Sequence, residues 1–126
     1  MLMPRLIMEQ INKKNVLIVD DSDLLQSRLK KALMDTDHNV NITQALSYRE
    51  AIDLFMPSFY DIIILDIDLP DGSGVNLLQE IKSLNPSTKV IMFTNYDTPE
   101  FKRSCMKFGA DYFFNKSEMA GLLNVI

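Results

Sequence analysis

The chain is poor in the features that mark secreted, disulfide-bonded or membrane proteins. Cys105 is its only cysteine, so no internal disulfide can form. No apolar run approaches the ~20 residues of a membrane span. The segment Met1–Arg5 lacks the long apolar core and small-residue cleavage site of a secretory signal. We therefore expect a cytoplasmic protein, with Cys105 as a small buried apolar side chain.

Positive charge and histidine are also scarce. Thirteen basic against 17 acidic residues give a net charge of -4, and the pI is near 4.9. This balance argues against direct binding to nucleic acid or to an anionic membrane, and favours a protein partner or a small anion. His38, the only histidine, lies in a polar stretch and is expected to be solvated. A hydrophobic content of 47% in 126 residues indicates one compact domain.

Short apolar runs alternate with segments of helical period along most of the chain. Helix caps are expected at Ser22, Ser47 and Ser117, and a helix stop at Gly109. Residues 1–13 precede the first strand and are predicted to be an N-terminal extension, weakly amphipathic through Leu2, Leu6, Ile7 and Ile11, while 14–126 form the domain. The predicted strands are 15–20, 39–45, 60–66, 89–94 and 111–116, and the predicted helices are 22–34, 47–56, 74–84, 98–108 and 117–126.

Strands that alternate with helices predict an α/β fold. We expect a five-stranded, mostly parallel sheet, doubly wound, with helices on both faces. In such sheets ligands bind outside the carboxyl ends of the strands. Those ends carry polar side chains: Asp20, Asp21, Asp66, Thr94 and Lys116. Adjacent strands lie ~4.8 Å apart, so the acids would share one crevice, and three carboxylates in one place require a cation.

This set of residues resembles the receiver domain of two-component response regulators, the CheY-like family. The resemblance also rests on Pro70 and Gly74 downstream of Asp66, and on Gly109, Ala110 and Asp111 ahead of Lys116. It covers nearly the whole chain from Lys14 onward. It implies the flavodoxin-like strand order 2-1-3-4-5.

The residue types themselves allow phosphoryl transfer. The Asp66 carboxylate can attack phosphorus and hold the phosphoryl group as an acyl phosphate. Mg²⁺ or Mn²⁺ bound by Asp20, Asp21 and Asp66 would neutralise the charge that such a transfer gathers. Lys116 would pair with phosphoryl oxygens, and the Thr94 hydroxyl would donate a hydrogen bond to another.

Further roles follow only from the resemblance. The backbone carbonyl of Asp68 corresponds to a further metal ligand, and Phe113 to an aromatic switch residue that fills the space left when Thr94 moves to the phosphate. The switched surface would be the fourth helix, fifth strand and fifth helix. The phosphoryl group would come from a phosphohistidine on a sensor histidine kinase or a phosphotransfer protein. Such a chain catalyses only its own phosphorylation and dephosphorylation, and is not otherwise an enzyme.

The sequence departs from the family pattern at several positions near the site. Ser117 follows Lys116 where receivers usually carry proline, and Asn95 follows Thr94 where a small residue is usual. Asp68 adds a fourth acid, and Tyr96 is bulky. We expect slower self-hydrolysis of the phosphate than in a receiver with small groups at 95 and 96.

Other interpretations remain open from the sequence. Asp20 and Asp21 are also suited to capping a helix, Lys116 to a solvated position, and Phe113 to ordinary packing. The pair Asp66 and Asp68 resembles the first motif of haloacid dehalogenase-type phosphatases, and a non-phosphorylated interaction module is a third possibility. No output module follows the last predicted helix, so we expect a chain that acts through a protein partner or is part of a longer regulator.

Overall fold

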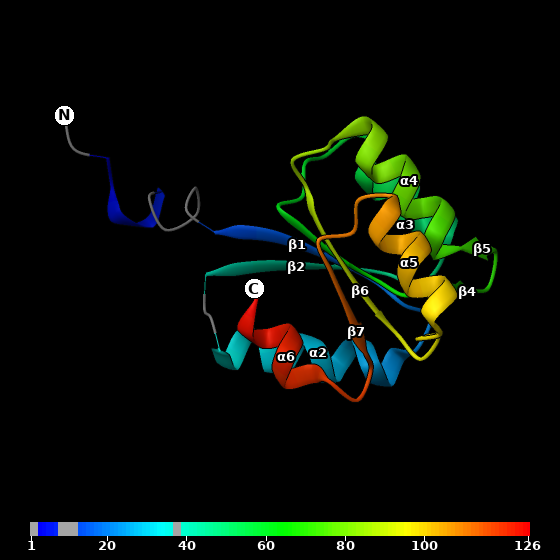
Figure 1. The fold of residues 1–126 in the computed structure, drawn as a ribbon. Coiled ribbons are helices and arrows are strands. Elements are labelled where there is room, and N and C mark those ends of the chain that lie inside the picture. The colour runs from blue at the N-terminus through cyan, green and yellow to red at the C-terminus, as the bar shows by residue number, and fades with distance from the viewer. Residues whose placement is uncertain (1–2, 8–12, 37–38) are drawn as a thin grey trace.

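Five parallel strands form the central sheet of the molecule. The computed structural model describes residues 3–7, 13–36 and 39–126. The sheet order is β2-β1-β3-β6-β7, which is the expected order 2-1-3-4-5 because β4 and β5 form a separate hairpin (Figure 1). The strands of the sheet are β1 (Lys14–Val19), β2 (Val40–Ala45), β3 (Ile62–Leu65), β6 (Lys89–Thr94) and β7 (Tyr112–Asn115).

Helices cover both faces of this sheet, as the alternating pattern predicts. The helices form two groups that pack on opposite faces of the sheet (Figure 1). The first group is α3 (Tyr48–Phe55), α4 (Gly74–Leu84) and α5 (Pro99–Lys107), and the second is α2 (Asp23–Thr36) and α6 (Met119–Asn124). The doubly wound α/β fold is therefore confirmed.

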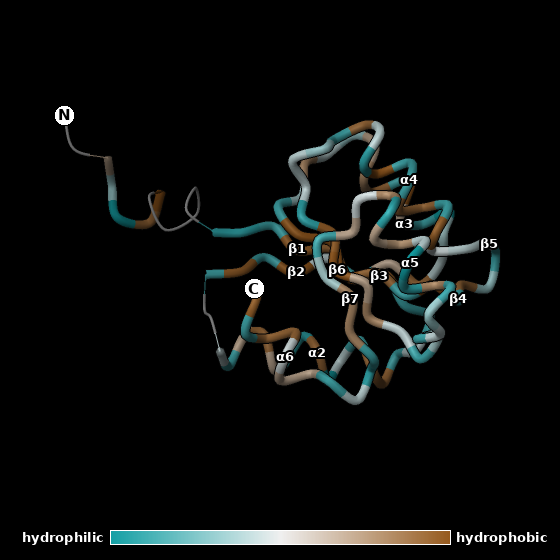
Figure 2. Tube along the Cα trace, viewed as in Figure 1, coloured by the Kyte–Doolittle hydropathy of each residue, from teal (hydrophilic) through white to brown (hydrophobic). Residues whose placement is uncertain are grey.

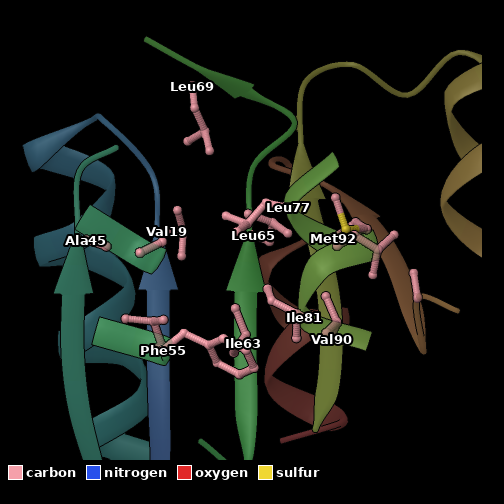
Figure 3. Close-up of a cluster of buried hydrophobic side chains, with 14 of the residues drawn as sticks. Val19, Ala45, Phe55, Ile63, Leu65, Leu69, Leu77, Ile81, Val90 and Met92 are labelled. Atoms are coloured by element: carbon pink, nitrogen blue, oxygen red, sulfur yellow. The ribbon is translucent and has the colours of Figure 1, made fainter. Parts of the chain in front are cut away.

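The core lies in two layers, one on each side of the sheet. Hydrophobic residues concentrate in the central strands (Figure 2), because a parallel sheet covered on both faces has no side that meets water. Val16 and Ile18 of β1 pack with Leu29 of α2 on one side. On the other, Leu77 and Ile81 of α4 lie over the central strands, as the close-up shows (Figure 3).

The ends of several elements agree with the sequence prediction, and one cap does not. Helix α4 and strand β6 have the predicted bounds, and Gly109 with φ of +100° follows α5. The prediction that Ser117 caps the last helix was wrong, since α6 begins at Met119 with Glu118 as its N-cap residue. The Asn115 side chain accepts a hydrogen bond from the Ser117 N–H at 2.9 Å, which turns the chain, and the N-cap lies one residue later than predicted.

The other two predicted caps are present. The Ser22 hydroxyl accepts from the Leu25 N–H at 3.2 Å, and the Ser47 hydroxyl accepts from the Glu50 N–H at 3.1 Å. The sequence did not reveal a second cap on α3. The carboxylate of Asp71, distant along the chain, accepts from the N–H groups of Tyr48 at 2.7 Å and Arg49 at 3.0 Å. The start of α3 is thereby fastened to the loop that follows β3.

That loop contains a small hairpin that the sequence did not predict. It pairs β4 (Asp68–Leu69) with β5 (Gly72–Ser73) in antiparallel fashion. Two-residue strands carry no readable alternation, which is why the pattern missed them. The hairpin returns the chain so that the Gly74 N–H donates to the Ile67 carbonyl at 2.7 Å. Helix α4 therefore starts directly against the segment that follows β3.

Cys105 is fully buried, as predicted, and burial raises the pKa of its thiol to about 11. Across residues 3–7, 13–36 and 39–126, none of the helices has the length and apolar character needed to cross a bilayer. The expected amphipathic pattern over residues 1–13 depends on Leu2 and Ile11, which lie outside the described residues, as does His38.

The contact between Gly74 and the preceding loop yields a stability prediction. A Cβ at position 74 would lie 2.0 Å from the backbone oxygen of Asp66, and backbone cannot move aside as a flexible side chain can. Gly74→Ala should therefore lower the free energy of unfolding by about 3 kcal/mol. Urea denaturation measures it, with Asn76→Ala as the control at an exposed position of the same helical turn. A loss no larger than that of the control would contradict the steric argument.

Candidate functional site

The carboxyl ends of the strands bring the predicted acids together. Asp20 follows β1 and Asp66 follows β3, and these two strands are direct neighbours in the sheet. Side-chain oxygens of Asp20, Asp21 and Asp66 lie within 4.8 Å of one another. Asp20 and Asp66 are buried, whereas Asp21 is exposed. The cluster thus has a buried floor and one side open to solvent.

Lys116 lies between two of these acids. Its Nζ is 2.8 Å from Asp20 Oδ2 and 2.9 Å from Asp66 Oδ2. Lys116 follows β7, with β6 between that strand and β3, so the long side chain spans the intervening strand. One ammonium faces three carboxylates, which leaves the cluster with excess negative charge.

The charges of this cluster shift its protonation equilibria. Burial is the main cause that raises the pKa of Asp20, and the hydrogen bonds from Lys116 and Ser22 offset it only in part. Burial acts to lower the pKa of Lys116, but the hydrogen bonds to Asp20 and Asp66 outweigh it, so this pKa is raised. Lys116 therefore stays protonated at neutral pH and holds its place between the acids.

Backbone contacts fix the two buried carboxylates. Asp20 Oδ1 accepts from the Ser22 N–H at 2.8 Å. The Asp66 N–H donates to the Val19 carbonyl at 3.0 Å, which continues the pairing of β1 with β3 beyond the last strand residue. Asp66 Oδ1 accepts a longer hydrogen bond, 3.4 Å, from the Asp68 N–H. Asp66 Oδ1 is therefore the less tightly engaged of its two oxygens.

Thr94 is the last residue of β6, which pairs with β3, the strand that precedes Asp66. The Thr94 side chain is fully buried. Its hydroxyl oxygen accepts from the Tyr96 N–H at 3.1 Å. This bond uses a lone pair of the oxygen and leaves the O–H as a donor. The backbone carbonyl of Thr94 accepts from the Lys116 N–H at 3.1 Å, so these two predicted site residues are joined through the backbone.

Asp68 and Tyr96, both noted in the sequence for their unusual side chains, contact each other. The Tyr96 hydroxyl donates to Asp68 Oδ2 at 3.3 Å, and the negative charge of Asp68 raises the pKa of Tyr96. The ring of Tyr96 also meets Phe101 edge to face, with centroids 6.0 Å apart. A small hollow of about 210 Å³ lies next to this pair. Asn95 is exposed.

Phe113 contributes to the packing of the core. It is half-buried in β7, opposite Met92 of β6, and packs against the core layer beneath α3, α4 and α5. Its role as a switch stays a prediction. A larger groove of about 900 Å³ between α3 and α4 includes none of the predicted site residues.

The acidic cluster fits a hard divalent cation. Its donors are carboxylate oxygens from Asp20, Asp21 and Asp66, the ligand type that Mg²⁺ prefers. Asp68 opens β4 two residues after Asp66, so its backbone lies next to the cluster. The residues present are thus suited to hold Mg²⁺ while Lys116 remains paired with two of the same acids.

Sequence reasoning missed one polar side chain beneath the site. Gln26 of α2 is buried at 2% exposure, and its amide donates to the backbone carbonyl of Asp20 at 3.0 Å. A usable signal was present in the sequence. Gln26 occupies the helical stripe that continues with Leu29 and Leu33, where an apolar residue would be expected.

Known proteins share this arrangement. The sequence matches the family described as the response regulator receiver domain over residues 16–126. A cyclic di-GMP phosphodiesterase of Thermotoga maritima is 33% identical over 87% of this chain and 29% of its own length. The chain spans between 25% and 32% of the length of the first curated relatives that it matches.

Solved structures agree in fold. A CheY-like response regulator receiver domain protein from Methanospirillum hungatei has a TM-score of 0.83 and 29% identity, with 90% of each chain covered. A response regulator from Burkholderia pseudomallei has a TM-score of 0.80 and 25% identity, with 88% of this chain and 65% of that chain covered. Since the family match covers residues 16–126, including all three acids and Lys116, the chain belongs to the response regulator receiver domains of two-component signalling.

Proposed function

We propose that this receiver domain accepts a phosphoryl group on Asp66 from a phosphohistidine of a sensor histidine kinase or phosphotransfer protein. The observation that carries the proposal is the position of Lys116, whose Nζ contacts both Asp20 and Asp66 at the open edge of the sheet. An ammonium beside the nucleophile can also contact the oxygens of an incoming phosphoryl group. A purely structural ion pair would not need the exposed third acid, Asp21.

In the transfer, a carboxylate oxygen of Asp66 forms a bond to phosphorus as the bond from phosphorus to the donor histidine nitrogen breaks. The electron pair of that bond stays with the imidazole nitrogen, and the product on this chain is an acyl phosphate. Asp66 Oδ1 is the candidate nucleophile, since Oδ2 is engaged by Lys116. Mg²⁺ held by Asp20, Asp21 and Asp66, with the Asp68 carbonyl, would neutralise charge on the phosphoryl oxygens.

Thr94 would donate its free O–H to a phosphoryl oxygen. To reach the phosphoryl group, the Thr94 side chain would move and break the hydrogen bond between its hydroxyl and the Tyr96 N–H. Phe113 would then fill the space that Thr94 leaves. The altered surface would be α5, β7 and α6, which a downstream protein reads. We also propose that this domain acts on no substrate other than its own phosphoryl group. It would work in the cytoplasm and would contact neither nucleic acid nor membrane itself.

A solved relative supports the acceptor chemistry. The Burkholderia pseudomallei response regulator was crystallised with a phosphorylated aspartic acid and a calcium ion. Asp66 has the corresponding chemistry here, because it is a buried strand-end carboxylate with a lysine contact and two further acids beside it. The phosphatase alternative would instead require repeated turnover of a phosphate ester.

Acylation of Asp66 is the direct test of the proposal. Acetyl phosphate with Mg²⁺ should add one phosphoryl group, a mass increase of about 80 Da, to the unmodified chain. Asp66→Asn should show no adduct, because an amide is not a nucleophile for phosphorus. Intact-mass spectrometry measures both, with Asp53→Asn as the control for an exposed acid on α3. An adduct on the Asp66→Asn variant, or turnover of many phosphate esters per chain, would contradict the proposal.

The excess charge of the cluster makes stability depend on the metal and on pH. Because burial raises the pKa of Asp20 in the folded chain, the metal-free protein loses stability as pH rises from the ordinary aspartate range through that raised pKa. Asp20→Asn should lack this loss and be more stable at neutral pH, by about 1 kcal/mol.

Mg²⁺ should stabilise the unmodified chain more than the Asp20→Asn variant. Urea unfolding measures both effects, and equal stabilisation of the two by Mg²⁺ would refute the metal assignment.

The contact between Tyr96 and Asp68 supports a long phosphate lifetime. The exposed Asn95 and Tyr96 are the two residues after Thr94, and both can restrict the approach of water to the acyl phosphate. Replacing both by alanine should shorten the lifetime severalfold, measured as loss of the mass adduct after removal of acetyl phosphate. Tyr112→Ala changes a similarly exposed tyrosine on β7 and should leave the lifetime unchanged. The proposal is wrong if the double variant matches the unmodified chain.

A further inference from the structure

Gln26 is a buried polar side chain that the proposed chemistry does not use. It is 2% exposed, and it lies on the face of α2 that otherwise presents Leu29 and Leu33 to the core. Among the described residues the other buried polar side chains are Asp20, Asp66, Thr88 and Thr94. Three of those belong to the site, and Thr88 is hydrogen-bonded at the opposite end of the sheet. Gln26 therefore calls for a separate explanation.

The amide nitrogen of Gln26 contacts three backbone carbonyls. Nε2 lies 3.0 Å from the carbonyl oxygens of Ile18, Asp20 and Ala45. An amide has two N–H donors, so at least one of them is shared between two oxygens. The opposite orientation would aim the amide oxygen at three carbonyl oxygens and is repulsive, which fixes the direction of the side chain.

These contacts join the ends of two strands. Ile18 lies near the end of β1, Asp20 directly follows that strand, and Ala45 is the last residue of β2. The Ala45 carbonyl also accepts from the Asp20 N–H at 3.0 Å. Gln26 thus holds the backbone of Asp20, while Ser22 and Lys116 hold its carboxylate.

The amide oxygen of Gln26, in contrast to the amide nitrogen, makes no hydrogen bond to the described residues. Gln26 Oε1 is buried and has no hydrogen-bond partner within the described part of the chain. A buried acceptor without a partner destabilises the fold, and an apolar side chain of the same size would avoid that loss. The gain from Gln26 must therefore lie in the three carbonyl contacts at the strand ends.

We infer that Gln26 is a positioning residue for the metal: by tying the carboxyl ends of β1 and β2 together, it holds Asp20 where its carboxylate can act with Asp21 and Asp66. The inference rests on the proposed use of a divalent ion at this cluster. Gln26 itself would touch neither the ion nor the phosphoryl group. Its effect passes through the backbone of Asp20, as partners behind metal ligands commonly act.

The test is the affinity of Gln26→Met for Mn²⁺, a paramagnetic substitute for Mg²⁺ that is followed by water-proton relaxation without any phosphoryl donor. Methionine keeps the length and removes the donor, so Mn²⁺ affinity should fall on the order of tenfold. Gln26→Asn serves as a second variant, because it keeps the amide but is one methylene too short to reach all three carbonyls, and it should also weaken binding.

The matched control is Thr88→Val. The Thr88 hydroxyl is fully buried and donates to the Tyr60 carbonyl at 2.9 Å, at the far end of the sheet. This variant should shift the urea midpoint but leave Mn²⁺ affinity unchanged. Unchanged Mn²⁺ affinity in both Gln26 variants, or an absence of Mn²⁺ binding by the unmodified chain, would overturn the inference. Absence of acylation alone, with Mn²⁺ bound as expected, would count only against the proposed function.

Discussion

The ammonium of Lys116 between the carboxylates of Asp20 and Asp66 is the interaction on which the site depends. It joins groups from the ends of β1, β3 and β7, which are far apart in the sequence. It is possible only because parallel strands end at one edge and because a lysine side chain can span the intervening strand. Without this cation, two buried carboxylates would face each other with no compensating charge inside the protein.

The buried acids lower the stability of the fold, and the surrounding residues limit this loss. Burial raises the pKa of Asp20 even though Lys116 and the Ser22 N–H both favour its charged form. Gln26 adds a contact to the Asp20 backbone, at the expense of an amide oxygen that has no hydrogen-bond partner among the described residues. Such an arrangement favours binding of charged groups over maximum stability, in keeping with the proposed binding of a divalent cation and a phosphoryl group.

The segment after Asp66 connects the site to the helices. The hairpin of β4 and β5 brings Gly74 against the backbone of Asp66, so α4 begins in contact with the proposed acceptor residue. Asp71 at the tip of the same hairpin caps α3 through two backbone N–H groups. A displacement near Asp66 would therefore reach α3 and α4 through direct contacts, in addition to the proposed route through Thr94 and β7.

The sequence by itself determined the fold class, the strand-end acids and Lys116, because apolar runs of strand length and their polar ends are local features. It also placed α4 and β6 correctly, where clear stops such as Asn85 and Pro86 bound the pattern. Only the tertiary structure decided the hairpin, the cap from Asp71 and the contact of Tyr96 with Asp68, since each joins residues distant in the chain or too few to form a pattern. Gln26 belongs to this second group, because the carbonyls that explain its burial come together only when β1 and β2 pair beneath α2.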